Sequence, residues 1–357
     1  MVTEIQLDGA RFLINGRPTY EGVTYWGKSI EGLLFNSRMV QAIFDDENPE
    51  TAVHWRYPDT GRWDPDRNTD EFCAALLQYR RHGLLAVTVG LQGGGSIYTP
   101  EIYDHYLNSA YEPDGTFKPA YFERLGRVLQ AADAAGMVVI VNYFYWKQAA
   151  RLESGAAIRR VTAAVTDWLL ETGYRNILVD VMNEVSDHWA RYPVLGTGGV
   201  HQLIEIVQQT TRDGRRLIVG SSTPGGDRLP VGRWAELEDL HMPHGNGCTP
   251  EELRAKLRAL KETEAYKRRL RPILINEDSI FVENLEAAVS ESCSWGFYCQ
   301  GYGSQYKDLK DWTVRGRETR TVQSFRSLSG YQTLPVNWSI NTEVKRAFFA
   351  KLARIVG

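Results

Sequence analysis

Two short apolar runs in this chain end in the same polar pair, an asparagine followed by a glutamate. Residues 179–182 lead into Asn183 and Glu184, and residues 272–275 lead into Asn276 and Glu277. An apolar run of this length is typical of a strand buried on both faces, so its polar end lies at the rim of a sheet. Two carboxyl groups at one rim can divide the roles of acid and nucleophile. We therefore expect Glu184 and Glu277 to face each other across one active site.

A single glutamate at the end of a strand also has ordinary explanations. It can cap a helix or form a surface ion pair, and for either residue alone this is about as good an explanation as catalysis. Both glutamates, however, end strands that are the fourth and seventh of the predicted series described below, and these lie nearly opposite each other in a closed barrel. The two together favour a shared site.

Composition indicates a globular protein without a nucleic-acid partner. The chain has 357 residues and is 43% hydrophobic, enough for one large core, although this length also permits two domains. Its 41 basic and 44 acidic residues give a net charge of −3, and neither sign forms a long run. This balance argues against nucleic acid and favours a neutral or mildly charged substrate.

The N-terminus and the cysteines point to a cytoplasmic protein without a membrane partner. The first residues form neither a basic region nor an apolar one, and no apolar run approaches the length needed to span a bilayer. A secreted form from which a signal peptide had been removed would look the same. Four cysteines contain no Cys-x-x-Cys pair, so reduced thiols are the preferred reading, with disulfides or metal binding as alternatives.

Helices and strands alternate along most of the chain. Gly83, Gly136 and Gly173 each end a segment with helical spacing and precede an apolar run. The predicted strands cover residues 20–26, 84–91, 137–143, 177–182, 217–220, a weak segment near 240, 272–276 and 292–298. The predicted helices cover residues 71–82, 121–135, 156–171, 202–211, 250–266, 284–290 and 342–355.

Eight strands alternating with helices predict an α/β protein of one domain, residues 1–357, folded as a (β/α)8 TIM barrel. Residues 1–19 include a β-hairpin that plugs or flanks one end of the barrel, and long loops follow strands one and eight. No Gly-x-Gly-x-x-Gly follows the first strand, which argues against an open dinucleotide-binding sheet. The run 93–95 is three glycines, but it lacks the Lys-Ser/Thr continuation of a phosphate-binding loop.

Several motifs resemble the retaining (β/α)8 glycoside hydrolases, especially the cellulase-like and mannanase-like family five. The similar segments are residues 12–18 with Glu21-Gly22-Val23, Met182-Asn183-Glu184, the strand-six histidine, Glu277, and residues 294–298. The resemblance implies that Glu184 is the general acid/base and Glu277 the nucleophile. It also implies that Asn183 donates to the sugar 2-hydroxyl and that Trp295 lies under the ring being cleaved. A cis peptide between Ser294 and Trp295 is implied as well.

The sequence departs from that family in three strands. The usual strand-two arginine is missing, and Thr88 and Gln92 stand nearby instead; the strand-three histidine is also missing from residues 142–146. On strand six the usual His-x-Tyr becomes His244-Gly245-Asn246. We expect His244 and Asn246 in the site and His241 packed within its strand. Because the missing groups normally hold the nucleophile ionised, other groups must do so here.

Aromatic residues at the ends of strands are candidates for sugar subsites, because their flat faces stack on sugar rings. Any one of them is about as likely to be ordinary packing. These candidates are Trp26, Tyr145, Trp146, Trp189, Tyr298 and Tyr302, and Gln92 joins them as a polar substrate-binding candidate.

We therefore predict a retaining O-glycoside hydrolase that cleaves oligosaccharides or glycosides by double displacement and needs no cofactor. One alternative is a carbohydrate-binding barrel without catalysis. Another is a metal-dependent hydrolase using His241, His244, Asp187 or His188, although these residues lack the His-x-His or His-Glu-x-x-His spacing of known zinc sites.

Overall fold

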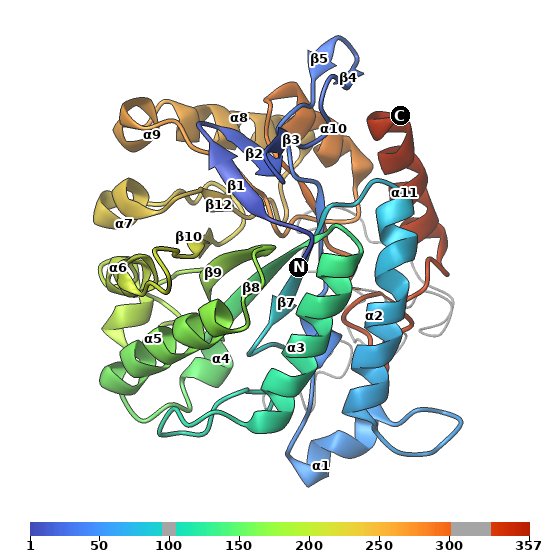
Figure 1. Cartoon of the computed structure of the whole chain (residues 1–357), viewed down its shortest axis with the longest axis vertical. Helices are drawn as coiled ribbons and strands as arrows, with labels where there is room; N and C mark the ends of the chain where they lie inside the picture. Colours follow the sequence, from blue (N-terminus) through green and yellow to red (C-terminus); the bar gives the residue numbers. More distant parts are fainter. Residues whose placement is uncertain (95–104, 301–329) are drawn as a thin grey trace.

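The computed structural model describes residues 1–94, 105–300 and 330–357, and its central element is a six-stranded parallel sheet (Figure 1). The strand order is β10-β9-β8-β7-β6-β13, and every neighbouring pair is parallel. The strands are β6 Asn36–Arg38, β7 Ala86–Gly90, β8 Val138–Tyr145, β9 Ile177–Asn183, β10 Ile218–Gly220 and β13 Gly296–Phe297. Their apolar residues are buried on both faces, as the uninterrupted apolar runs predict.

Parallel pairing continues beyond the six strands. β11 (Ser222–Thr223), which follows β10 directly, pairs in parallel with β12 (Met242–Pro243). Single parallel bridges then join His241 to Ile273 and Leu274 to Ser294. Ser294 stands two residues before β13, so these bridges continue the parallel pairing from β12 toward that strand.

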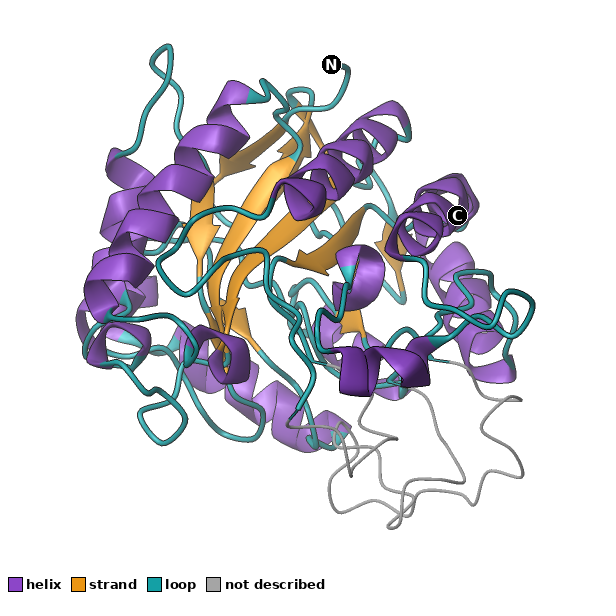
Figure 2. Cartoon of the chain, turned by 90° about the horizontal axis from the view of Figure 1, so that it is seen from below, coloured by secondary structure: helices purple, strands orange, loops and turns teal. Residues whose placement is uncertain are grey.

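Helices surround the sheet and lie between successive strands (Figure 2). Each long helix buries one apolar stripe; α2, for example, buries Phe72, Leu76 and Tyr79. Thr249 and Glu252 form a capping box at the start of α8. The longer helices are α2 Pro65–Arg81, α3 Pro119–Ala134, α5 Gly155–Glu171, α6 His201–Gln209, α8 Pro250–Lys261, α10 Val282–Ser290 and α11 Glu343–Val356, and the shorter ones are α1 Pro49–Ala52, α4 Trp146–Ala149, α7 Gly232–Leu237, α9 Glu264–Arg268 and the 3-10 turns Val40–Ile43, Val53–Trp55 and Pro193–Leu195.

The predicted hairpin is present and closes one end of the sheet. β1 (Ile5–Asp8), β2 (Arg11–Ile14) and β3 (Arg17–Pro18) form a small antiparallel sheet. Ile5 and Phe12 pack in one apolar cluster with residues near the amino ends of the parallel strands, namely Leu34, Leu85, Ala86, Val138, Leu178, Leu240 and Leu274. This end is therefore filled by apolar side chains, and polar groups converge at the other end.

The position of the first strand was predicted wrongly. Within residues 20–26, only Thr24–Tyr25 form a strand, β4, and it pairs with β5 (Lys28–Ser29) in a small antiparallel hairpin away from the parallel sheet. The strand that joins the sheet is β6, residues 36–38. Its three residues are Asn-Ser-Arg, all buried, and such a short polar strand lacks the apolar pattern on which the prediction depended.

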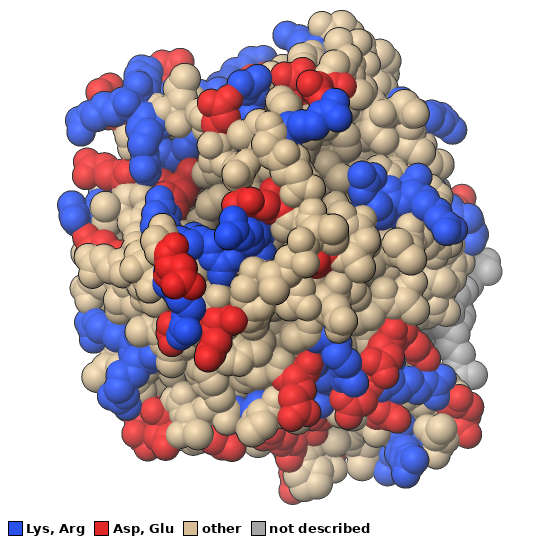
Figure 3. All heavy atoms as spheres, in the orientation of Figure 1, with Lys and Arg blue, Asp and Glu red and all other residues tan. Residues whose placement is uncertain are grey.

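Acidic and basic side chains are interspersed on the face of the molecule shown in Figure 3. This mixture agrees with the near-balanced composition. No helix among the described residues is long and apolar enough to cross a membrane.

Candidate active site

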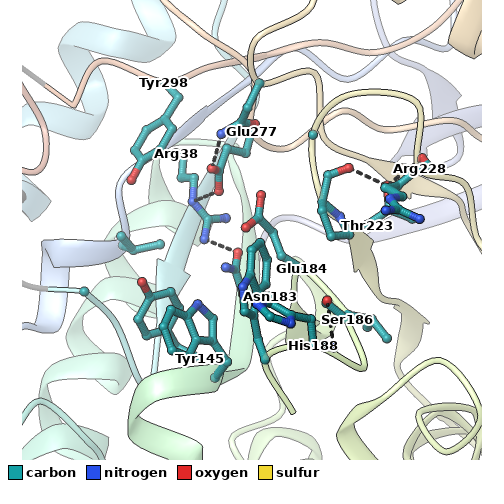
Figure 4. Close-up of a pocket in the computed structure, with 18 of the residues that line it drawn as sticks. Arg38, Tyr145, Asn183, Glu184, Ser186, His188, Thr223, Arg228, Glu277 and Tyr298 are labelled. Atoms are coloured by element: carbon teal, nitrogen blue, oxygen red, sulfur yellow. Dashed lines mark hydrogen bonds and ion pairs between the residues drawn. The ribbon is translucent and has the colours of Figure 1, made fainter. Parts of the chain in front are cut away.

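A cavity of 970 Å³ lies at the carboxyl ends of the parallel strands, and both predicted glutamates line it. Glu184 follows the last residue of β9, and Glu277 follows the bridged segment 273–274. Figure 4 shows the two carboxyl groups pointing into the same space. One donor atom from each of Glu184, Glu277 and His244 lies within 4.8 Å of the other two. The fold therefore brings together two carboxyl groups that are 93 positions apart in the chain.

Glu277 is held by two side chains at hydrogen-bond distance. Arg38 Nε lies 2.6 Å from Oε2, and Asn246 Nδ2 donates to Oε1 at 2.6 Å. The side chains of Arg38 and Glu277 are only 4% and 8% exposed, so this ion pair is shielded from solvent. These charge-assisted contacts hold both oxygens of the Glu277 carboxyl group in fixed positions.

Arg38 is the site residue that the sequence analysis missed. It stands at the end of β6, and its Nε contacts Glu277. Burial works to lower the pKa of Arg38, but the negative charges of Glu277, Asp180 and Glu184 raise it above its ordinary value. Arg38 also donates to Asn183 Oδ1, and this contact leaves the amide NH2 of Asn183 available to a ligand (Figure 4).

Glu184 has an unusual backbone conformation for a residue with a side chain. Its φ is +54°, in the left-handed region, which costs free energy for any residue except glycine. The side chain is 16% exposed, and Oε1 lies 3.0 Å from His244 Nδ1. The end of β9 thus turns sharply enough to direct this carboxyl group into the cavity.

Burial of His244 favours its neutral imidazole. It lowers the pKa to about 3, against the opposing negative charge of Glu277, and the positive charges of Arg38 and Lys256 act in the same direction as burial. Its Nδ1 lies 3.0 Å from Glu184 Oε1 and 3.6 Å from Glu277 Oε2. A neutral ring can therefore form a hydrogen bond through Nδ1 with one carboxyl group or the other. Lys256 Nζ, itself buried, donates to the His244 carbonyl at 2.7 Å and fixes this segment.

Most of the other predicted site residues line the same cavity. Gln92 is buried; its Nε2 donates to Ser109 Oγ at 2.9 Å, and its Oε1 accepts from the Tyr145 N–H at 3.2 Å. Tyr298 donates from its hydroxyl to Gln332 at 3.0 Å and lies next to Arg38, as Figure 4 shows. The predicted lining residues that the cavity contains are Gln92, Tyr145, Trp146, Trp189, Asn183, Asn246 and Tyr298. Tyr302 lies outside the described residues.

Two predicted tryptophans are not in the site. Trp295 has no exposed surface; its Nε1 donates to Asp278 Oδ2 at 2.9 Å, and its ring packs against Phe348 of α11. Side chains alternate along a strand, so Trp295 faces the helices while Tyr298, three positions later, faces the cavity. Trp26 is 74% exposed and stacks on Tyr25 in the β4–β5 hairpin. The platform assigned to Trp295 and the subsite assigned to Trp26 are therefore wrong.

Two smaller expectations have different outcomes. A cis peptide bond was expected between Ser294 and Trp295, but among the described residues only the bond between Leu334 and Pro335 is cis. His241 is packed within its strand as expected: it is fully buried and its Nδ1 contacts Glu238.

A metal ion is a poor fit to this donor set. Glu184, His244 and Glu277 form the cluster of possible metal ligands that the described residues contain, and no other residue from the predicted metal set belongs to it. Arg38 already occupies Glu277 at 2.6 Å, and its guanidinium would repel a divalent cation bound there. Asp187 accepts from the Thr197 backbone N–H at 2.7 Å and from the hydroxyl of the same residue.

Comparisons with known proteins show the fold. No protein-family model matches the chain, and no curated protein sequence does. Among solved structures, a broad-specificity family 5 endoglucanase from Clostridium longisporum matches with a TM-score of 0.54 and 10% identity, covering 95% of this chain and 99% of that one. A family 5 glycoside hydrolase from Bacteroides vulgatus matches with a TM-score of 0.51 and 10% identity, over 90% of this chain and 65% of that one. The chain thus has the fold of glycoside hydrolase family 5.

Proposed function

We propose that this protein is a retaining O-glycoside hydrolase that works by double displacement. The observation that carries the proposal is that one carboxyl oxygen of Glu184 and one of Glu277 lie within 4.8 Å of each other at the rim of the same cavity. Retaining enzymes place their carboxyl groups about 5 to 5.5 Å apart, whereas inverting enzymes need about 6.5 to 9.5 Å to admit a water molecule. The family 5 fold supports the same assignment.

In the first step Glu277 attacks the anomeric carbon while Glu184 gives its proton to the leaving oxygen. The bond from the anomeric carbon to the leaving oxygen breaks, and an ester to Glu277 forms. In the second step Glu184 takes a proton from water, the water oxygen attacks the anomeric carbon, and Glu277 is released as a carboxylate. No external oxidant, reductant or cofactor enters this balance.

Three neighbours support these roles. Arg38 and Asn246 hold Glu277 through separate oxygens, so one face of the carboxylate is oriented for attack. Asn183, with its carbonyl oxygen held by Arg38, presents its NH2 group to a sugar hydroxyl. The ring of His244 forms a hydrogen bond with Glu184. This hydrogen bond can hold the carboxyl group in place while Glu184 changes between acid and base.

We further propose that the parallel strands form a closed (β/α)8 barrel. The six-stranded sheet supplies strands one to five and strand eight, and the bridged segments 241–243 and 273–274 supply strands six and seven. In this arrangement Glu184 and Glu277 end strands four and seven, which places them on opposite sides of the barrel mouth.

The lining favours a substrate made of sugars. Trp146 and Trp189 stack with ring centroids 5.8 Å apart and both line the cavity, so they present flat apolar faces beside the glutamates. A cavity of 970 Å³ accommodates an oligosaccharide or a glycoside of a few rings.

The test is a panel of para-nitrophenyl glycosides of glucose, mannose, galactose and xylose, in both anomeric forms, with wild type, Glu277→Ala and Glu184→Gln. We expect wild type to hydrolyse at least one and Glu277→Ala to lose roughly 1,000-fold or more of that activity. A 2-fluoro glycoside of the same sugar should label Glu277, as mass spectrometry of its peptides would show. Undiminished activity in Glu277→Ala, or a label on another residue, would refute the mechanism.

The guanidinium of Arg38, 2.6 Å from Glu277, disfavours the alternative of a metal-dependent hydrolase, and this alternative can be tested directly. Activity that disappears on dialysis against a chelator and returns with zinc or manganese would favour it over the glycosidase.

A further inference from the structure

Ser222 of β11 holds the backbone of Glu184 and of the next residue. Its hydroxyl oxygen accepts the Glu184 N–H at 3.0 Å, and its carbonyl accepts the Val185 N–H at 2.9 Å. Both contacts lie where β9 ends and the chain turns. A residue in the left-handed region persists only where its surroundings hold it there, and these two hydrogen bonds do so.

Asp180 in turn holds Ser222. Its Oδ1 accepts the Ser222 N–H at 3.0 Å, and its Oδ2 accepts the Ser222 hydroxyl at 3.1 Å. The hydroxyl also lies 3.2 Å from the Met182 carbonyl oxygen, a second possible acceptor. When the hydroxyl proton is directed to Asp180, the lone pairs of the same oxygen face the Glu184 N–H. Asn276 Nδ2 donates to Oδ2 at 3.1 Å, so the carboxylate is fixed from the opposite side as well.

We propose that Asp180, acting through Ser222, is a positioning residue that holds Glu184 in its left-handed backbone conformation and so aims its carboxyl group at the leaving oxygen. The catalytic half of this inference rests on the proposed function. Asp180 lies in β9, four positions before Glu184, but it acts through Ser222 of β11. Neither Asp180 nor Ser222 lines the cavity, and both are fully buried.

The surroundings of Asp180 make this contact sensitive to pH. Burial raises the pKa of Asp180 to about 7, although Arg38 on β6, Asn276 and Ser222 all work to lower it. Arg38 also faces Glu277 and Glu184, and from β8 the neutral Asn142 contacts only the Asp180 carbonyl. A protonated Asp180 presents an O–H in place of one acceptor oxygen, and this disturbs the orientation of the Ser222 hydroxyl.

The kinetic test uses Ser222→Ala, Asp180→Asn and a matched control, Ser221→Ala. Ser221 is the adjacent serine and equally buried; its hydroxyl bonds to the N–H and the carbonyl of Met182 in β9, whereas the Ser222 hydroxyl also contacts Glu184 and Asp180. Each variant is assayed on two glycosides of the sugar that wild type prefers. The dinitrophenyl glycoside has a leaving group that departs without being protonated, whereas the methyl glycoside has one that the general acid must protonate.

We expect Ser222→Ala and Asp180→Asn to lower kcat/KM for the methyl glycoside by roughly 10- to 100-fold and for the dinitrophenyl glycoside by less than about 3-fold. Azide, a nucleophile that needs no general base, should raise turnover of the dinitrophenyl glycoside in both variants. Ser221→Ala should change the two substrates by the same factor. A uniform loss in Ser222→Ala, equal for both leaving groups, would overturn the proposal.

Crystal structures of the three variants test the positioning without any assay. In Ser222→Ala we expect Glu184 to leave the left-handed region and to lose its contact with His244, while Ser221→Ala keeps both. An unchanged Glu184 in Ser222→Ala would overturn the proposal, whatever the activity. An inactive wild type that labels with no 2-fluoro glycoside would refute the proposed function instead, and the crystal structures would still decide the role of Asp180 in positioning Glu184.

Discussion

Replacement of Arg38 by methionine is the most direct perturbation of the proposed nucleophile. Methionine keeps much of the apolar length of arginine but removes the charge that lies 2.6 Å from Glu277. Both side chains are more than 90% buried, so the variant leaves a carboxylate in the protein with Asn246 as its remaining close donor. Breaking one partner of a buried ion pair costs about 3 to 5 kcal/mol.

We expect Arg38→Met to lower the free energy of unfolding by about 3 kcal/mol at neutral pH. The loss should shrink as the pH falls toward about 4, where a carboxyl group can take a proton instead of remaining as an uncompensated charge. A similar loss in the transition state would reduce kcat/KM by roughly 100-fold. Asn183 loses its orienting partner in the same variant, so substrate binding should weaken as well.

The measurements are urea denaturation at two pH values and the aryl glycoside assay. Arg228→Met is the matched control, because Arg228 lines the same cavity but is exposed. The double variant Arg38→Met with Glu277→Gln should recover much of the lost stability, since the buried charge is gone. A change below about 1 kcal/mol in Arg38→Met, together with wild-type kcat/KM, would contradict the reasoning.

Three other predictions follow from buried groups. The pKa of Asp180 is about 7 in the folded protein and lower in the unfolded chain. The stabilisation that its protonation gives is therefore complete below about pH 4 and is lost as the pH rises through 7. In urea denaturation, the free energy of unfolding of wild type relative to Asp180→Asn should fall by up to about 4 kcal/mol across that pH range. Trp295→Phe should lower the Tm and leave KM unchanged, because this side chain is buried against α11, whereas Trp146→Ala should raise KM and leave the Tm nearly unchanged. Prolonged dialysis against a chelator should leave glycosidase activity intact, because Arg38 occupies the position of a cation; loss of activity restored by metal would contradict this.

The elements with a long periodic pattern were predicted well from the sequence. α3, α5 and α11 and the strands β7, β8 and β9 lie within two residues of their predicted bounds, whereas α2 begins six residues earlier than predicted. Their apolar spacing is a local property of the chain, repeated over several turns or several strand positions. The convergence of Glu184 and Glu277 also followed from local patterns, because each ends an apolar run and all parallel strands end at the same edge.

Arg38 and Ser222 could not be found in this way. Each belongs to a strand of two or three mostly polar residues, which is a strand only because its neighbours pair with it. The side-chain alternation at Trp295 was readable in principle, but only once the register of β13 was known.

What the sequence by itself determined is therefore the alternation of helices and strands and the two glutamates at strand ends, because both are carried by the order of neighbouring residues. What only the tertiary structure decided is the set of groups that hold those glutamates. Arg38 reaches Glu277 across 239 positions, and Asp180 reaches Glu184 by way of Ser222, 42 positions from Asp180. Contacts of this kind depend on pairing between distant segments, and no local pattern in the chain encodes them.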